Sequence, residues 1–122
     1  MRALGELEAQ VMRKIWARSG PVTVRDIVAD LQLDRPIAYT TVMTVMDNLR
    51  KKGWLRRHQD GRAYRYEPAV TSEEHNARVM RQALADSSDR AGTLMHFIGE
   101  LSADEADALA EAYRRLTGRD AP

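Results

Sequence analysis

The stretch from Leu55 to Tyr66, LRRHQDGRAYRY, concentrates side chains that bind phosphate. It places four arginines and one histidine around an Asp-Gly pair. Guanidinium groups suit phosphate because they present several donors in a rigid fork. From Arg50 to Tyr66 there are seven Lys and Arg residues against one acid, Asp60, which gives a local net charge of +6. Such a segment predicts salt-dependent binding to nucleic acid, because each neutralised phosphate releases counterions.

A helix just before this stretch carries a second group of polar side chains. It is predicted to run from Tyr39 to Lys52 and to end at Gly53. Its apolar residues recur at i, i+3, i+4 and i+7, as on a core-facing stripe: Val42, Val45, Met46 and Leu49. The other face carries three threonines, which weaken an isolated helix and therefore indicate a function. The expected contacts to nucleic acid are Tyr39, Thr40, Thr41, Met43, Thr44, Asn48, Lys51, Arg57, Arg62 and Tyr64.

Each of these features also has a plainer interpretation. A charged hairpin is often only a solubilising surface, and a threonine-rich helix face can be ordinary surface. Met43 can fill a core as readily as it contacts a base. Asp47 can accept a hydrogen bond from a cytosine or from a neighbouring arginine. The two features in this order along the chain favour DNA binding, with threonine hydroxyls on phosphates or base edges and Arg62 at the tip of a phosphate clamp.

Periodicity predicts the elements that must position these residues. An amphipathic helix begins near Leu4 and ends at the Ser-Gly-Pro sequence 19–21. Thr23 with Asp26 resembles a capping box that opens a short helix to about Leu33.

Asp60-Gly61 is a strong signal for a two-residue hairpin with a type I′ turn. A turn centred there pairs Gln59 with Arg62, Arg57 with Tyr64, and Leu55 with Tyr66. Three helices followed by a two-stranded ribbon predict a mostly α (α+β) fold of the winged helix-turn-helix type, in which the third helix enters the DNA major groove.

The two halves of the chain differ in net charge, which suggests that they have different functions. Residues 1–69 carry 13 Lys and Arg against 8 acids, a net of +5, whereas residues 70–122 carry 6 against 10, a net of −4. We expect a DNA-binding domain at 1–69 and a helical dimerisation region at 70–122. In the second half, Thr71 with Glu74 and Ser102 with Glu105 predict further capping boxes.

Apolar stripes in this second half need a partner, because such short helices bury too little surface alone. A second copy in a two-fold dimer is the simplest partner, and folding back onto the first domain in a monomer is the alternative. The predicted interface residues are Met80, Leu84, Leu94, Phe97, Ile98, Leu101, Leu109 and Tyr113.

The sequence argues against several other classes of protein. It has no cysteine, and no apolar run approaches a membrane span or the core of a signal peptide, so we expect a cytoplasmic protein. His58, His75 and His96 lie on different elements without metal-ligand spacing, and His75 is expected to be exposed. No phosphate-binding glycine loop or nucleophile motif is present, so neither a cofactor, a metal nor an enzyme activity is expected.

Four segments together resemble the BlaI/MecI (penicillinase repressor) family, especially its actinobacterial members: LGELEAQVMRKIW, AYTTVMTVMDNLRKKGWL, GRAYRYEP and MHFIGELSADEADALAEA. The resemblance covers nearly the whole chain. It implies a homodimeric repressor with an N-terminal winged helix and a C-terminal helical dimerisation region. It also implies operators that are dyads of TACA/TGTA half-sites.

In antibiotic-responsive members of this family, a membrane sensor protease triggers cleavage of the repressor at an Asn-Phe bond. The matching dipeptide here is His96-Phe97, with histidine in place of asparagine. Met43 and Asn48 stand where coccal members have basic residues, which bears on operator preference. The copper-responsive branch carries a cysteine cluster, which this chain lacks.

The sequence therefore predicts a DNA-binding repressor of β-lactamase or related stress genes. The alternative is a winged-helix adaptor that binds proteins and not DNA. Such an adaptor is expected to have a neutral or acidic third helix and wing, and the +6 segment argues against it.

Overall fold

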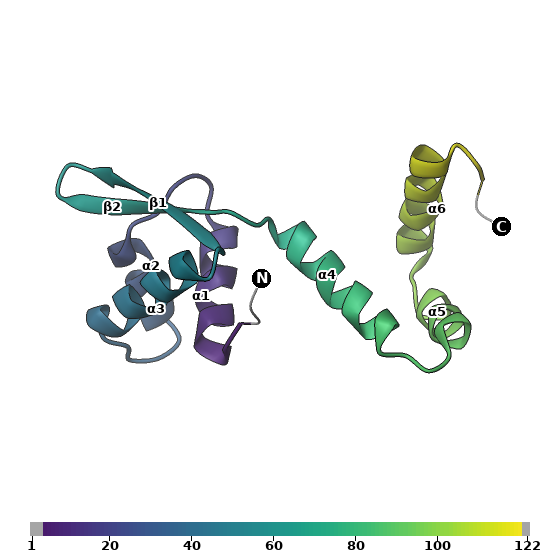
Figure 1. Ribbon diagram of the computed structural model, residues 1–122, viewed down its shortest axis with the longest axis horizontal. Helices are drawn as coiled ribbons and strands as arrows, with labels where there is room; N and C mark the ends of the chain where they lie inside the picture. Colours follow the sequence, from purple (N-terminus) through teal and green to yellow (C-terminus); the bar gives the residue numbers. More distant parts are fainter. Residues whose placement is uncertain (1–3, 121–122) are drawn as a thin grey trace. The chain divides into compact units, whose positions relative to one another are not determined.

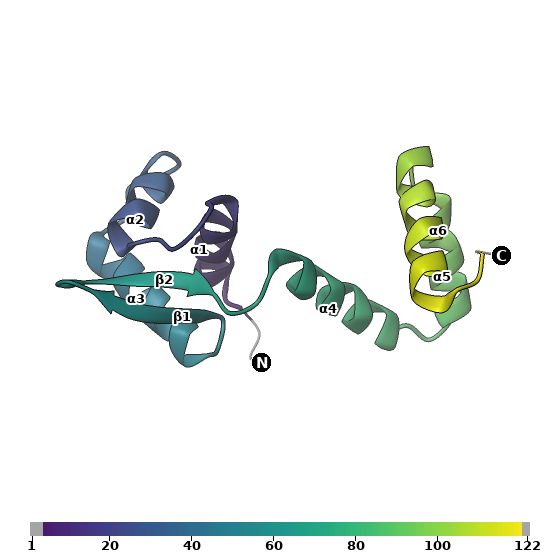
Figure 2. The ribbon, with the colours of Figure 1, turned by 90° about the horizontal axis from the view of Figure 1, so that it is seen from above.

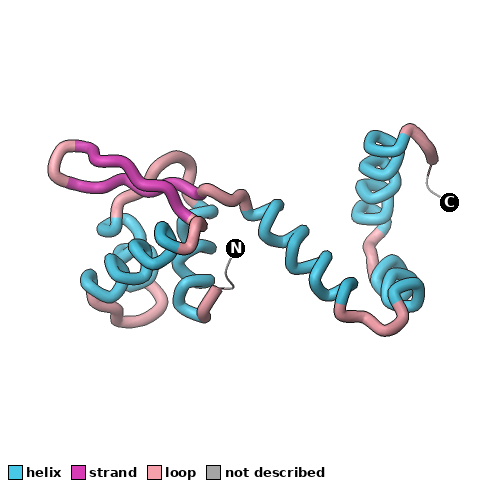
Figure 3. The backbone as a smooth tube through the Cα atoms, viewed as in Figure 1, coloured by secondary structure: helices cyan, strands magenta, loops and turns pink. Residues whose placement is uncertain are grey.

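The computed structural model describes residues 4–120, and within them it contains six helices and one two-stranded antiparallel sheet, which confirms the predicted fold class (Figure 1, Figure 3). The elements are α1 (Glu6–Ala17), α2 (Val24–Gln32), α3 (Tyr39–Lys51), β1 (Leu55–Asp60), β2 (Ala63–Pro68), α4 (Ser72–Ala85), α5 (Arg90–Gly99) and α6 (Ala103–Thr117). Contacts divide the chain into two compact units, Met1–Asn76 and Ala77–Pro122.

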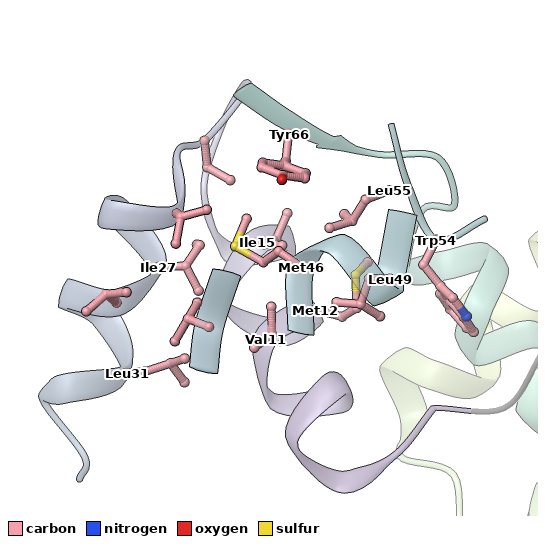
Figure 4. Close-up of a cluster of buried hydrophobic side chains, with 14 of the residues drawn as sticks. Val11, Met12, Ile15, Ile27, Leu31, Met46, Leu49, Trp54, Leu55 and Tyr66 are labelled. Carbon is pink, nitrogen blue, oxygen red and sulfur yellow. The ribbon is translucent and has the colours of Figure 1, made fainter. Parts of the chain in front are cut away.

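The N-terminal unit has one hydrophobic core. Helices α1, α2 and α3 surround it, and the root of the β1–β2 hairpin packs against α1 and α3 while its turn extends beyond the helices (Figure 2). Every element of the three-helix and hairpin arrangement supplies buried side chains. Those labelled in Figure 4 are Val11, Met12, Ile15, Ile27, Leu31, Met46, Leu49, Trp54, Leu55 and Tyr66.

Capping boxes begin two helices as predicted, at Thr23 and at Ser102. The third predicted box, at Thr71 and Glu74, shows one of its two hydrogen bonds, from the Glu74 amide to the Thr71 hydroxyl at 3.0 Å. The Thr23 hydroxyl accepts a hydrogen bond from the Asp26 amide at 3.1 Å, and the Asp26 carboxylate accepts one from the Thr23 amide at 2.9 Å, so the predicted capping box is confirmed. Ser102 and Glu105 form the same motif at the start of α6. At the end of α3, Gly53 adopts a φ of 89°, which a residue with a Cβ rarely adopts.

The predicted hairpin register is wrong by two residues. In the structure Asp60 pairs with Ala63, Gln59 with Tyr64, and Arg57 with Tyr66. The loop is therefore Gly61-Arg62, with a φ of 65° at Gly61, and no residue other than glycine has a positive φ in the described chain. A type I′ turn on Asp60-Gly61 requires positive φ at Asp60, and a type II′ turn starting at glycine avoids that strain. Since each partner moves by two positions, every side chain keeps its predicted face.

Pairing with the segment before α2 anchors the hairpin to the helices. The Val22 amide donates to the Tyr66 carbonyl at 2.8 Å, and the Tyr66 amide donates to the Val22 carbonyl at 2.7 Å. The Tyr66 side chain is only 2% exposed and fills the core below this bridge. The hairpin thus leaves the core at a fixed point.

Two tryptophans and a histidine hold the first turn of α4 against the N-terminal unit. The His75 ring stacks on Trp16 with centroids 5.5 Å apart, and it meets Trp54 edge-on at 5.0 Å. The Trp16 indole N–H also donates to the Val70 carbonyl at 2.9 Å. The prediction that His75 is exposed is therefore wrong: its ring is half-buried in an aromatic cluster. We call Trp16, Trp54 and His75 the aromatic clamp.

The C-terminal unit lacks a core of its own. None of the described residues of α5 and α6 is buried, nor is any of α4. Large apolar side chains are exposed instead, among them Met80 at 55%, Ile98 at 51% and Leu94 at 44%. Clusters of this kind on a protein surface indicate an interaction site.

Replacing His75 by alanine is expected to destabilise the N-terminal unit by about 1 kcal/mol, because two aromatic contacts are lost. Trp16 and Trp54 are the only tryptophans in the chain, so urea unfolding followed by tryptophan fluorescence measures this directly. The native emission is also expected to shift to the red as both rings gain water. His58→Ala, on the exposed part of β1, is the control and should change neither quantity. Equal effects of the two variants would contradict the clamp.

Candidate nucleic-acid interface

Helix α3 has one face sealed in the core and the other facing solvent. Val42, Met46 and Leu49 are each 0% exposed. The remaining face is exposed along its whole length, and it consists of the residues predicted as contacts: Tyr39, Thr40, Thr41, Met43, Thr44, Asn48 and Lys51. The predicted interpretation of Met43 as a core residue is wrong, since its side chain is 43% exposed.

Four polar side chains of this face are unpaired within the described residues, unlike Lys51, which pairs with Asp47. The side chains of Thr40, Thr41, Thr44 and Asn48 make no hydrogen bond to any residue between 4 and 120. Their hydroxyl and amide groups are therefore free to donate to phosphates or to bond to base edges. The donors and acceptors on base edges are what a helix in the major groove reads.

Most of the positive charge of the segment 50–66 is already paired within the chain. Six of its seven cations form ion pairs: Arg50, Lys51 and Arg57 with Asp47, Lys52 with Glu8, Arg56 with Glu67, and Arg65 with Asp60. Arg62, in the exposed loop of the hairpin, has no such partner in the part of the chain that the structure describes. The +6 of the sequence therefore overstates the charge that is free to bind phosphate.

Asp47 joins α3 to the hairpin. Its carboxylate lies 2.9 Å from Arg50 Nη2, 3.2 Å from Lys51 Nζ and 3.2 Å from Arg57 Nη1, and Arg57 belongs to β1. Hydrogen bonds from Arg50 and then Lys51 hold the pKa of Asp47 below its ordinary value. Of the two partners predicted for Asp47, the neighbouring arginine is the one found.

Arg57 lies between α3 and the hairpin, where it contacts Tyr64 as well as Asp47. Its guanidinium stands 4.0 Å from the centre of the Tyr64 ring, in cation–π geometry. A hydrogen bond with Tyr66 raises the pKa of Arg57, and the charge of Asp47 adds to that effect. Arg57 thus holds the hairpin against α3, while its predicted contact to DNA remains a prediction.

A cleft separates the exposed face of α3 from the hairpin. It has a volume of about 470 Å³ and is lined by Thr23, Val24, Arg25, Tyr39, Met43, Arg62, Ala63, Tyr64 and Tyr66. Four of the predicted contact residues therefore lie around one cavity: Tyr39, Met43, Arg62 and Tyr64. Arg25, from the first turn of α2, is a candidate that the sequence reasoning missed. The capping box at Thr23 was the available signal, because it places Arg25 in the exposed first turn of the helix that precedes α3.

The predicted dimerisation residues lie on α4, on α6, and on and just after α5. Leu84 and Leu101 are half-buried, and the other six are exposed: Met80, Leu94, Phe97, Ile98, Leu109 and Tyr113. His96 and Phe97, the predicted cleavage position, both lie within α5.

Two other kinds of site are not found among residues 4–120. No group of three or more His, Cys, Asp or Glu side chains is arranged to hold a metal ion. The helices also include none with the length and apolar character that crossing a membrane requires.

The fold and this surface define a winged-helix transcriptional regulator. The family model for the penicillinase repressor matches residues 4–115. This chain belongs to the penicillinase repressor family, which confirms the resemblance noted in its sequence. The family is one of transcriptional regulators, which is not a class of enzymes.

Individual relatives agree with this assignment. The chain is 45% identical over 116 residues to the transcriptional regulator BlaI of Mycobacterium tuberculosis, covering 93% of this chain and 84% of that protein. The Bacillus licheniformis BlaI monomer, solved in complex with the blaP half-operator, matches with a TM-score of 0.51 and 26% identity, over 60% of this chain and 88% of that one. The DNA-binding domain of the repressor BlaI matches with a TM-score of 0.52 and 27% identity, over 58% and 85%.

Replacing Asp47 by asparagine is expected to strengthen binding to random-sequence duplex and to weaken discrimination in favour of the operator. The change releases Arg50, Lys51 and Arg57 from their shared carboxylate and loosens the joint between α3 and β1. The slope of log affinity against log salt should steepen by about one for each phosphate newly contacted. Fluorescence anisotropy on both duplexes at several salt concentrations measures this.

Asp30→Asn is the matched control, because it makes the same charge change at a pair with Arg18, 2.8 Å apart, that involves neither α3 nor the hairpin. It should leave both the salt slope and the discrimination ratio as they are. The Asp47 joint would be contradicted if the two variants behaved alike.

Proposed function

We propose that this chain is a homodimeric transcriptional repressor that occupies a dyad operator. In this proposal residues 1–69 bind DNA, with α3 in the major groove and the hairpin over the adjacent backbone, and residues 70–122 join two copies. The observation that carries the proposal is the outward face of α3. Its threonine and asparagine side chains make no hydrogen bond to any described residue, and its Tyr39 and Met43 line one cleft with Arg62, which forms no ion pair there.

The relatives support a duplex as the partner. The Bacillus licheniformis BlaI monomer was solved on a half-operator, and it aligns with 60% of this chain. The family resemblance supports TACA/TGTA half-sites in particular. Base edges in the major groove differ for each base pair. In this proposal the threonines and Asn48 read those edges, while Arg62 and Lys51 hold phosphates.

The lack of a core in the C-terminal unit supports a second copy of the chain as its cover. An apolar surface on α4, α5 and α6 gains hydrophobic stabilisation only when another surface covers it. A two-fold interface uses the same patch on both copies, so one chain supplies both sides. Two-fold symmetry also matches a dyad operator, on which two modest half-site affinities combine.

Loss of this interface would release the operator without any change in α3. We propose that a membrane sensor protease pathway acts in this way, through cleavage at His96-Phe97 in α5. Cutting there separates the part of the apolar surface on α6 from the part on α4. The proposed targets are β-lactamase or related stress genes, in keeping with the family.

Salt dependence of operator binding tests the DNA-binding proposal. Full-length protein should shift a duplex carrying a TACA/TGTA dyad, and its affinity should fall by on the order of a thousandfold between about 50 and 200 mM salt, as for a protein with several phosphate contacts. A duplex of equal length with scrambled half-sites is the control and should bind far more weakly. No shift at either salt concentration would favour the protein-binding adaptor instead.

Two neighbouring residues of α4 test the dimer. Met80→Asp should raise the dimer dissociation constant more than a hundredfold, because burying one unpaired carboxylate in each copy costs on the order of 3 kcal/mol or more. Val79→Asp introduces the same group at the next residue, which is 54% exposed against 55% for Met80, and lies off the predicted stripe. Sedimentation velocity over a range of concentrations should find this control dimeric. Dissociation of both variants, or of neither, would contradict the predicted interface.

A further inference from the structure

We propose that the cleft between α2, α3 and the hairpin, with Arg25 and Arg62 in its lining, is the seat of one sugar-phosphate strand of the operator. This inference rests on the proposed function and specifies how the duplex is held. It adds Arg25, and the cleft as a whole, to the contacts made by α3 and the hairpin tip.

The composition of the cleft favours a phosphodiester. No Asp or Glu side chain lines it, whereas Arg25 and Arg62 both do. Three other cavities of the N-terminal unit each include at least one carboxylate: Asp34 in two of them, and Glu67 with Glu73 in the third. The cleft is therefore suited to an anion in a way that its neighbours are not.

Both arginines are available to that anion. Neither Arg25 nor Arg62 forms an ion pair or a side-chain hydrogen bond with any of residues 4–120. The charges of Arg56, Arg57 and Arg65, in contrast, are partly offset by an internal carboxylate, which weakens their attraction for a phosphate. A charge-assisted hydrogen bond made by an unpaired guanidinium is not weakened in this way.

The position of the cleft matches the path of the backbone. One side of it carries Tyr39 and Met43 from the exposed face of α3, and the other carries residues 62–64 of the hairpin. When a helix lies in the major groove and a wing lies over the adjacent groove, one sugar-phosphate strand separates the two grooves and passes between helix and wing. This cleft lies between these two elements, since residues of both line it.

The other side chains of the lining suit the rest of the strand. The hydroxyls of Tyr39 and Tyr64 donate to phosphate oxygens, and both rings are partly exposed, at 48% and 43%. The Met43 side chain offers apolar contact to a deoxyribose. The cleft thus combines cations, neutral donors and an apolar wall, which is the chemistry of a nucleotide backbone.

Neutral phosphates placed one at a time in the duplex test this inference. Full-length protein is titrated with TACA/TGTA duplexes in which successive phosphates are replaced by methylphosphonates. One phosphate in each half-site is expected to stand out, with affinity falling about tenfold when it is neutralised, as for loss of a charged hydrogen bond. In Arg25→Gln and in Arg62→Gln, binding to the unmodified duplex should be about tenfold weaker, and that phosphate should lose its sensitivity.

Arg13→Gln is the matched control, because Arg13 is exposed on α1 and also has no ion pair with a described residue. It should keep the wild-type affinity and the wild-type sensitive phosphate. A sensitive phosphate that stays equally sensitive in Arg25→Gln would overturn the inference while leaving the proposed function intact. Wild-type protein that binds none of the duplexes would overturn the proposed function itself. The scan on wild-type protein needs no variant, so a poorly folded variant cannot decide the result.

Discussion

The N-terminal unit depends on the burial of one stripe of α3. Val42, Met46 and Leu49 are completely buried, so the rotation of α3 about its own axis is fixed and its polar side must face solvent. The same core holds Leu55 and Tyr66 at the root of the hairpin. Since both elements are anchored in one core, the distance between the helix face and the hairpin is set by packing and not by the ligand.

Ion pairs within the chain then determine how much positive charge this surface presents. The seven cations between Arg50 and Tyr66 would by themselves favour non-specific binding to any polyanion. Carboxylates of the same chain form ion pairs with six of them. Pairing lowers the net field that drives non-specific binding, while the paired arginines still stiffen the junction between α3 and β1. Free positive charge is left at chosen points such as Arg62. An arrangement of this kind favours binding that depends on shape and position over binding by total charge.

Local sequence signals made much of this fold predictable, whereas the contacts between segments far apart in the sequence could not be predicted. The start of α2 at Thr23 was predictable because a capping box depends on only four consecutive residues. The turn was correctly placed near Gly61, but the predicted strand register was wrong. The loop consists of Gly61 and Arg62, so Asp60 does not need a positive φ. The clustering of three cations on Asp47 and the burial of His75 depend on elements far apart in sequence. No periodicity in one segment contains that information.

The contrast between the two units bears on how repression would respond to a signal. The N-terminal unit has its own buried core, so its fold does not need a partner. The C-terminal unit buries no side chain of α5 or α6 within one copy, so in the proposed dimer its stability depends on protein concentration. In the proposed dimer, operator occupancy depends on the C-terminal unit, and we expect a single cut or a loss of apolar contact there to lower it. The proposed switch therefore acts through the C-terminal helices and leaves the buried core of the N-terminal unit, and with it the orientation of α3, unaltered.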